Sequence, residues 1–134
     1  MIVVFDASTF VSAALKPKSI PEQALLHAVA PPNRLILSPE VLAEYRDVIF
    51  RPKFDRFVSI ERRQLVLDIL TFASELISPI EPVQACRDPK DDKYLALAAA
   101  GNADVIVSSD VRHLLSMHPW RGIAILSPAA FLGA

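Results

Sequence analysis

Residues 2–6 read IVVFD, four strand-forming apolar residues followed by an acid. An unbroken apolar run of this kind is typical of a strand that is covered on both faces of a sheet. Three later runs have the same character, namely residues 34–37 (RLIL), 105–107 (VIV) and 123–126 (IAIL). Segments with helical periodicity lie between them. The alternation predicts an α/β fold of three layers, α/β/α, with a central parallel sheet and right-handed crossovers.

Polar residues mark the expected ends of the helices. A serine or threonine precedes each apolar helical stretch, which predicts N-caps at Ser8 or Thr9, Ser19, Ser38, Ser59 and Ser127. Gly101 is expected to stop a helix that begins near Asp91. Residues 78–86, with two prolines, are expected to form an extended crossing segment.

The composition fits one folded domain that spans residues 1–134. Hydrophobic residues make up 52% of the chain and charged residues 22%, which favours a real core over disorder. No apolar run is long enough to span a bilayer, and the first residues do not resemble a signal peptide, so we expect a cytoplasmic protein. The single cysteine, Cys86, fits a reducing compartment.

The charge balance narrows the possible partners. With 14 basic and 15 acidic side chains, the formal net charge is −1, which argues against binding nucleic acid through bulk positive charge. Any contact with nucleic acid must come from a local patch, or from metal ions in an acidic cleft.

Acidic residues fall where such a cleft is expected. Asp6 and Asp110 follow two of the predicted strands, and Glu44 lies in the second turn of the helix after residues 34–37. Asp91 and Asp92 stand at the start of the helix that precedes residues 105–107. In an open parallel sheet, ligands bind beyond the carboxyl ends of the strands. These acids are therefore expected to meet at one edge.

Several carboxylates in one place repel each other unless cations neutralise them. Mg²⁺ or Mn²⁺ is the natural partner for such oxygen ligands, and these ions support phosphoryl transfer. Simpler roles stay open for each acid: a helix cap for Asp6, a turn for Asp110, a solvated helix face for Glu44. Asp88 is expected to be mainly a cap or turn residue, whereas at least one of the two acids at 91 and 92 should reach the cleft.

Four segments together resemble the PIN domain family: VFDAS at 4–8, SPEVLAE at 38–44, RDPKDDK at 87–93 and ADVIVSSD at 103–110. Within that family they resemble the VapC-like toxins of toxin–antitoxin systems. The resemblance covers nearly the whole chain, and four motifs in the right order are more specific than any one alone. It implies a Rossmann-like PIN fold and an endoribonuclease that depends on Mg²⁺ or Mn²⁺. It also implies an RNA substrate, an antitoxin partner and a homodimer.

Residue by residue, the resemblance assigns Asp6, Glu44 and Asp110 to the catalytic metal site. The fourth catalytic acid is Asp91 or Asp92, with Asp91 slightly favoured, and both are candidate metal ligands. In the implied mechanism, a metal-activated water attacks an RNA phosphodiester, and no side chain acts as a nucleophile.

Other polar residues take supporting or structural roles. Ser8 stands where many relatives of the resembled family have asparagine, and Ser108 stands where many have threonine, so both are expected to support the site. The three histidines, His27, His113 and His118, are expected to be surface or structural residues.

Basic residues gather in the middle of the chain at positions Arg46, Arg51, Lys53, Arg56, Arg62 and Arg63. Among them, Arg51, Lys53 and Arg56 are candidates for binding RNA phosphates. A solvated basic face explains the same pattern equally well.

Two other classes of function compete with the nuclease hypothesis. A haloacid-dehalogenase-type phosphatase also has an acid at the end of its first strand, but it needs a second aspartate two residues later, where this chain has Ser8. The non-enzymatic alternative is a PIN fold that has lost catalysis and serves as a binding or regulatory module. The full set of acids argues against that alternative.

Overall fold

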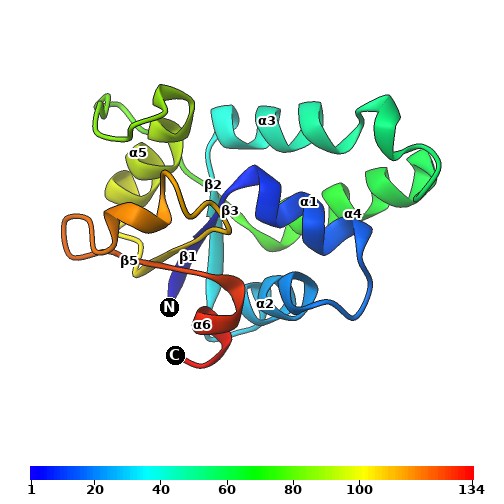
Figure 1. Ribbon diagram of the computed structural model, residues 1–134, viewed down its shortest axis with the longest axis horizontal. Helices are drawn as coiled ribbons and strands as arrows, with labels where there is room; N and C mark the ends of the chain where they lie inside the picture. The colour runs from blue at the N-terminus through cyan, green and yellow to red at the C-terminus, as the bar shows by residue number, and fades with distance from the viewer.

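A five-stranded parallel sheet forms the centre of the computed structural model, which describes residues 1–134. The strands lie in the order β3-β2-β1-β4-β5 (Figure 1). Their bounds are β1 Ile2–Phe5, β2 Arg34–Leu37, β3 Glu75–Leu76, β4 Val105–Val107 and β5 Ala124–Leu126. The predicted α/β class and parallel sheet are thus confirmed, and the fourth predicted strand begins one residue later than expected.

The edge strand β3 was absent from the predicted elements. It has only two residues, both exposed, so it lacks the apolar run that indicates a buried strand. Its pairing with β2 matches Ile36 with Glu75 and Leu37 with Leu76. The strand therefore forms because it pairs with β2, and its own sequence contributes little to it.

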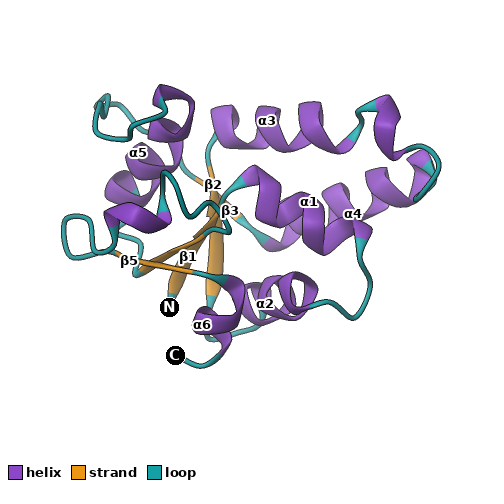
Figure 2. Ribbon diagram, in the orientation of Figure 1, coloured by secondary structure: helices purple, strands orange, loops and turns teal.

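Helices cover both faces of the sheet (Figure 2). Helices α1 (Ala7–Leu15), α2 (Ile20–Val29) and α6 (Pro128–Leu132) pack together on one side, and α5 (Asp92–Ala100) packs on β1 and β4 on the other. Helix α3 (Pro39–Ile49) packs against both α1 and α5. With α4 (Ile60–Ala73) it forms a pair that projects away from the sheet (Figure 1). Three short 3₁₀ turns cover Pro52–Phe54, Pro89–Asp91 and Leu115–Met117.

The core lies along the central strands. Val3, Val4 and Phe5 of β1 and Ile106 of β4 are fully buried, as a two-sided sheet requires. Burial of each such side chain contributes about 1.5–3 kcal/mol. Burial of the apolar strands therefore determines where the carboxyl edge of the sheet lies.

Four of the predicted N-caps are confirmed: the side chains of Ser19, Ser38, Ser59 and Ser127 each accept a backbone N–H from the first helical turn. The prediction for the first helix was wrong. Asp6 caps α1, with its Oδ1 accepting from the N–H of Thr9 at 2.9 Å, because the helix begins at Ala7 immediately after the strand. Ser8 and Thr9 lie inside the helix instead.

Helix α5 ends at Ala100 and Gly101 follows it, as predicted. A Cβ at Gly101 would lie 2.4 Å from Cδ1 of Ile36 and 2.9 Å from Cδ1 of Ile77, so a larger residue there would force these side chains to move. Asn102, with φ of 51°, supplies the left-handed residue that reverses the chain. None of the helices combines the length and the apolar character needed to cross a membrane.

Candidate metal centre

Asp6 is the buried centre of the carboxyl edge of the sheet. Only 4% of the residue is exposed, and its two oxygens face different partners. Oδ2 accepts a hydrogen bond from Oγ of Ser108 at 2.5 Å, whereas Oδ1 accepts from the N–H of Thr9 and, at 3.3 Å, from Oγ of Ser8. Burial raises the pKa of the Asp6 carboxyl above its ordinary value, against these hydrogen bonds, which lower it. Both predicted supporting serines therefore touch this acid.

Asp110 organises the loop that follows β4. Its backbone N–H donates to Oγ of Ser108 at 3.0 Å, and its Oδ1 accepts the backbone N–H groups of Arg112 and His113. The other oxygen, Oδ2, lies 2.8 Å from Nδ1 of His113. Ser108 thus links the two strand-end acids, since it donates to Asp6 and accepts from Asp110.

Asp91 joins this group from the turn before α5. Burial and the charges of Asp88, Asp110 and Asp6 raise the pKa of Asp91 from 3.8 to about 6, while His113 lowers it. Its Oδ2 is 3.8 Å from Nδ1 of His113. Three chain segments, the ends of β1 and β4 and the start of α5, therefore bring acids within electrostatic reach of each other.

Asp92, the other candidate at this turn, has a different environment. Its Oδ1 accepts the backbone N–H groups of Ala85 and Cys86 at 3.1 and 2.7 Å, so it ties the crossing segment to α5. Asp88 caps the preceding turn by accepting the N–H of Lys90, as expected. Of the two neighbouring acids, the structure thus brings Asp91 beside Asp110 and His113, and it engages Asp92 with backbone groups.

Glu44 lies on α3 and pairs with Lys93 of α5. The lysine is 12% exposed, and its Nζ also donates to the backbone carbonyl of Lys90. Burial raises the pKa of Tyr45 and Tyr94, and the charges of Glu44 and Asp6 raise it further, whereas Glu44 is not among the charges that shift Asp91. It therefore forms the outer end of the acidic group, with its own counter-ion.

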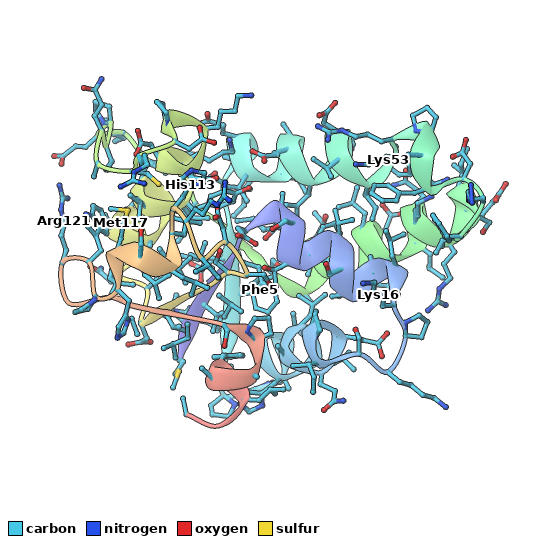
Figure 3. All side chains as sticks on the ribbon, viewed as in Figure 1. Phe5, Lys16, Lys53, His113, Met117 and Arg121 are labelled. Atoms are coloured by element: carbon cyan, nitrogen blue, oxygen red, sulfur yellow. The ribbon has the colours of Figure 1, made fainter.

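His113 is the member of this group that sequence reasoning missed (Figure 3). Its ligand atoms and those of Asp88 and Asp91 lie within 4.8 Å of one another. The available signal was its place three residues after the strand-end acid, in the run DVRH at 110–113. His118 fits the expected structural role, since its Nδ1 accepts the N–H of Ile125, and His27 is an exposed residue of α2.

The donor set fits a hard divalent cation. The charges of Asp6 and Asp110 both act on Asp91, the ligand atoms of Asp88, Asp91 and His113 lie within 4.8 Å of one another, and Asp91 is partly exposed, so an ion can reach it from solvent. Without a cation, the raised pKa of Asp91 reflects first its burial and then the charges of the neighbouring acids. Residues of this kind could hold Mg²⁺ or Mn²⁺.

The basic residues of the middle segment divide into two kinds. Arg51, Lys53 and Arg56 are exposed around the turn between α3 and α4, and Figure 3 shows Lys53 at the end of α3 that is remote from His113. Arg63 was expected among them, but only 1% of it is exposed. Its guanidinium donates to the carbonyl of Ile49 and to Asp55, so it serves the hairpin internally.

Comparisons with known proteins agree with this fold. The sequence profile described as the PIN domain matches residues 2–112. An uncharacterised protein of Methanocaldococcus jannaschii is 29% identical over 116 residues, which cover 86% of this chain and 74% of the relative.

Two solved structures superpose over nearly their full lengths, each at 18% identity. One is from VapBC2 of Rickettsia felis bound to a DNA fragment from its promoter, with a TM-score of 0.63 and coverage of 93% of this chain and 97% of the other. The second is from VapBC-1 of nontypeable Haemophilus influenzae, with a TM-score of 0.59 and coverage of 96% and 99%. By its sequence profile and its fold, the chain belongs to the PIN domain family.

Proposed function

We propose that this protein is a divalent-metal-dependent endoribonuclease and the toxin component of a toxin–antitoxin pair. The observation that carries the proposal is the convergence of Asp6, Asp91 and Asp110 at the carboxyl edge of the sheet, with the pKa of Asp91 raised to about 6. An arrangement that costs stability in the absence of a cation is expected at a functional site. The family membership agrees with it.

The acids would take distinct roles. Asp6 is buried and held on both oxygens, so it fixes the position of the site, and Asp91 and Asp110 complete the ligand set from either side. Glu44, held by Lys93, would face the outer part of the cleft. We assign the fourth catalytic acid to Asp91, because Asp92 is engaged by two backbone N–H groups.

A divalent cation bound there would lower the pKa of a water and offset the negative charge that builds on the scissile phosphate. The side chains supply orientation. Ser108 fixes the carboxylate of Asp6 through Oδ2, and Ser8 and the N–H of Thr9 fix it through Oδ1. No serine or cysteine has a paired histidine base, so the chain offers no nucleophile of its own.

Cleavage of labelled single-stranded RNA by the purified chain tests this proposal. We expect cleavage with Mn²⁺ or Mg²⁺, none with EDTA, and at least about a hundredfold loss in Asp6→Asn. Asp68→Asn is the matched control, since Asp68 is an exposed acid of α4 that accepts a hydrogen bond from Gln64, and its activity should equal wild type. If folded wild-type protein cleaves none of several RNAs with either metal, the nuclease proposal is wrong and the protein is a PIN fold that acts as a binding or regulatory module.

The turn between α3 and α4 is our candidate for additional RNA contacts. Arg51, Lys53 and Arg56 are exposed there, and the guanidinium of Arg56 lies over the ring of Phe57, which is 66% exposed. Phosphate contacts weaken with salt. Replacing all three with glutamine should therefore weaken RNA binding severalfold and flatten its salt dependence, while Mn²⁺ affinity stays unchanged.

An apolar groove between α1, α2 and α4 is our candidate for the antitoxin. It is lined by alanines of α1 and by Leu25, Leu26, Val66 and Ile69. Leu26 is 59% exposed and Ile69 is 60% exposed. Exposed apolar surface of this kind marks a protein interface. The two solved neighbours both come from VapBC structures, which favours an antitoxin as the occupant.

Co-expression with the cognate antitoxin tests the groove. Ile69→Asp should abolish co-purification, whereas Leu65→Asp, on an exposed position of the same helix outside the groove, should not. Equal binding by both variants would contradict this placement. We also propose a homodimer, for which light scattering should give about twice the chain mass of 14.7 kDa.

A further inference from the structure

His113 lies against two of the acids assigned to the metal site, and the turn after β4 holds it there. Oδ1 of Asp110 accepts the backbone N–H groups of Arg112 and His113 at 3.1 and 3.2 Å. These bonds bring the His113 ring back over the same carboxylate, with Nδ1 2.8 Å from Oδ2. The position of the imidazole is thus set by the acid itself.

The distances from His113 to two of the acids are close to those between adjacent ligands of one ion. Two adjacent ligands of an octahedral cation with bonds of about 2.1 Å lie about 3 Å apart. Nδ1 of His113 is 2.8 Å from Asp110 Oδ2 and 3.8 Å from Asp91 Oδ2, and its ligand atom lies within 4.8 Å of those of Asp88 and Asp91, which also lie within 4.8 Å of each other. The side chains of His113, Asp110 and Asp91 are partly exposed, at 28%, 29% and 18%, so an ion can enter between them.

We propose that His113 supplies an imidazole nitrogen to a divalent cation held by Asp91 and its neighbouring acids, which makes this a site of mixed oxygen and nitrogen ligands. The inference rests on the metal-dependent function proposed above. Mg²⁺ prefers oxygen ligands, whereas an imidazole nitrogen favours first-row transition ions. The site therefore prefers Mn²⁺ to Mg²⁺, and His113 is the source of that preference.

The opposite role for His113 is a counter-ion that pairs with the two carboxylates and competes with a cation for them. The two roles predict opposite effects of removing the ring. Loss of a ligand weakens Mn²⁺ binding, whereas loss of a competitor strengthens it. Glutamine at this position retains a hydrogen-bonding side chain and leaves the backbone bonds to Asp110 in place.

Pulsed electron paramagnetic resonance of the full chain loaded with Mn²⁺ directly detects a nitrogen bound to the ion. We expect nitrogen-14 modulation from one imidazole in wild type and in His27→Gln, a matched variant of an exposed histidine on α2, and its loss in His113→Gln. Calorimetric titration should show at least about a tenfold weaker Mn²⁺ affinity in His113→Gln, with a smaller change for Mg²⁺.

Mn²⁺ bound to wild type without nitrogen modulation would overturn the inference and leave the proposed function standing. Tighter Mn²⁺ binding by His113→Gln would also overturn it, in favour of the competitor. Failure of wild type to bind Mn²⁺ at all would remove the metal site itself, and with it both proposals. Because the first measurement is made on wild type, a folding defect in the variant does not affect it.

Discussion

Asp91 is a carboxyl group whose ionisation the fold opposes. Its pKa is raised from 3.8 to about 6 by burial and by Asp88, Asp110 and Asp6, against His113. A folded-state pKa above the unfolded value contributes stability at low pH, and that contribution is lost as pH rises through about 6. In EDTA, the unfolding free energy of Asp91→Asn should therefore increase relative to that of wild type as the pH rises from about 4 to about 7.

Urea denaturation at several pH values measures this difference. Saturating Mn²⁺ should reverse the order, because a ligand that binds only the folded state stabilises it and the variant has lost a ligand. A difference that is the same at every pH would show that Asp91 carries no such strain.

Asp92 should behave differently from its neighbour. Asp92→Ala removes the acceptor for the N–H groups of Ala85 and Cys86, so we expect a loss of about 1–2 kcal/mol of unfolding free energy. Asp92→Asn keeps an acceptor and should lose less. Mn²⁺ affinity, measured by calorimetry, should stay near wild type in Asp92→Asn and fall in Asp91→Asn. The reverse order would move the metal site to Asp92.

At the level of residues, the sequence predicted the acids but could not distinguish Asp91 from Asp92. Both lie in one turn, and the choice depends on backbone groups six or seven residues earlier that engage Asp92. His113 was missed for a related reason. Its contact with Asp110 depends on the conformation of the loop, which no apolar pattern encodes.

Among the elements, the α3–α4 hairpin depends on a buried arginine. Arg63 of α4 donates to the carbonyls of Ile49 and Arg51 and to Oδ1 of Asp55. Arg63→Gln should cost about 2–3 kcal/mol of unfolding free energy, because it leaves buried acceptors at the end of α3 unpaired. Arg62→Gln, at the exposed position beside it, should cost almost nothing. Equal losses in the two variants would contradict this role.

The predicted elements were reliable where local chemistry decides them. Serine caps at Ser19, Ser38 and Ser59 begin helices because they satisfy free N–H groups whatever the surroundings. The strand Glu75–Leu76 could not be predicted, since its partner β2 determines it. Arg63 was taken for a surface residue because burial of a charge depends on partners that are distant in the fold.

Across the whole molecule, the near-zero net charge is compatible with a local group of exposed basic residues. Asp6 and Asp110 follow β1 and β4 at the carboxyl edge of the sheet, and Arg51, Lys53 and Arg56 are exposed around the turn between α3 and α4, where Figure 3 labels Lys53. Such an arrangement suits a nuclease that holds a cation at one place and grips phosphates at another. Helix α5 packs on β1 and β4, and α3 packs against α1 and α5, so the acids are placed before any ligand arrives.

The most direct test of the central claim identifies the ends of the RNA fragments that wild type produces with Mn²⁺. Attack by water on the phosphodiester forms no 2′,3′-cyclic phosphate, whereas attack by the RNA's own 2′-hydroxyl does. We predict fragments without cyclic phosphate, formed only when metal is present and absent with Asp6→Asn. Cyclic phosphate ends, or cleavage that persists in EDTA, would contradict a metal-dependent hydrolytic centre at this edge of the sheet.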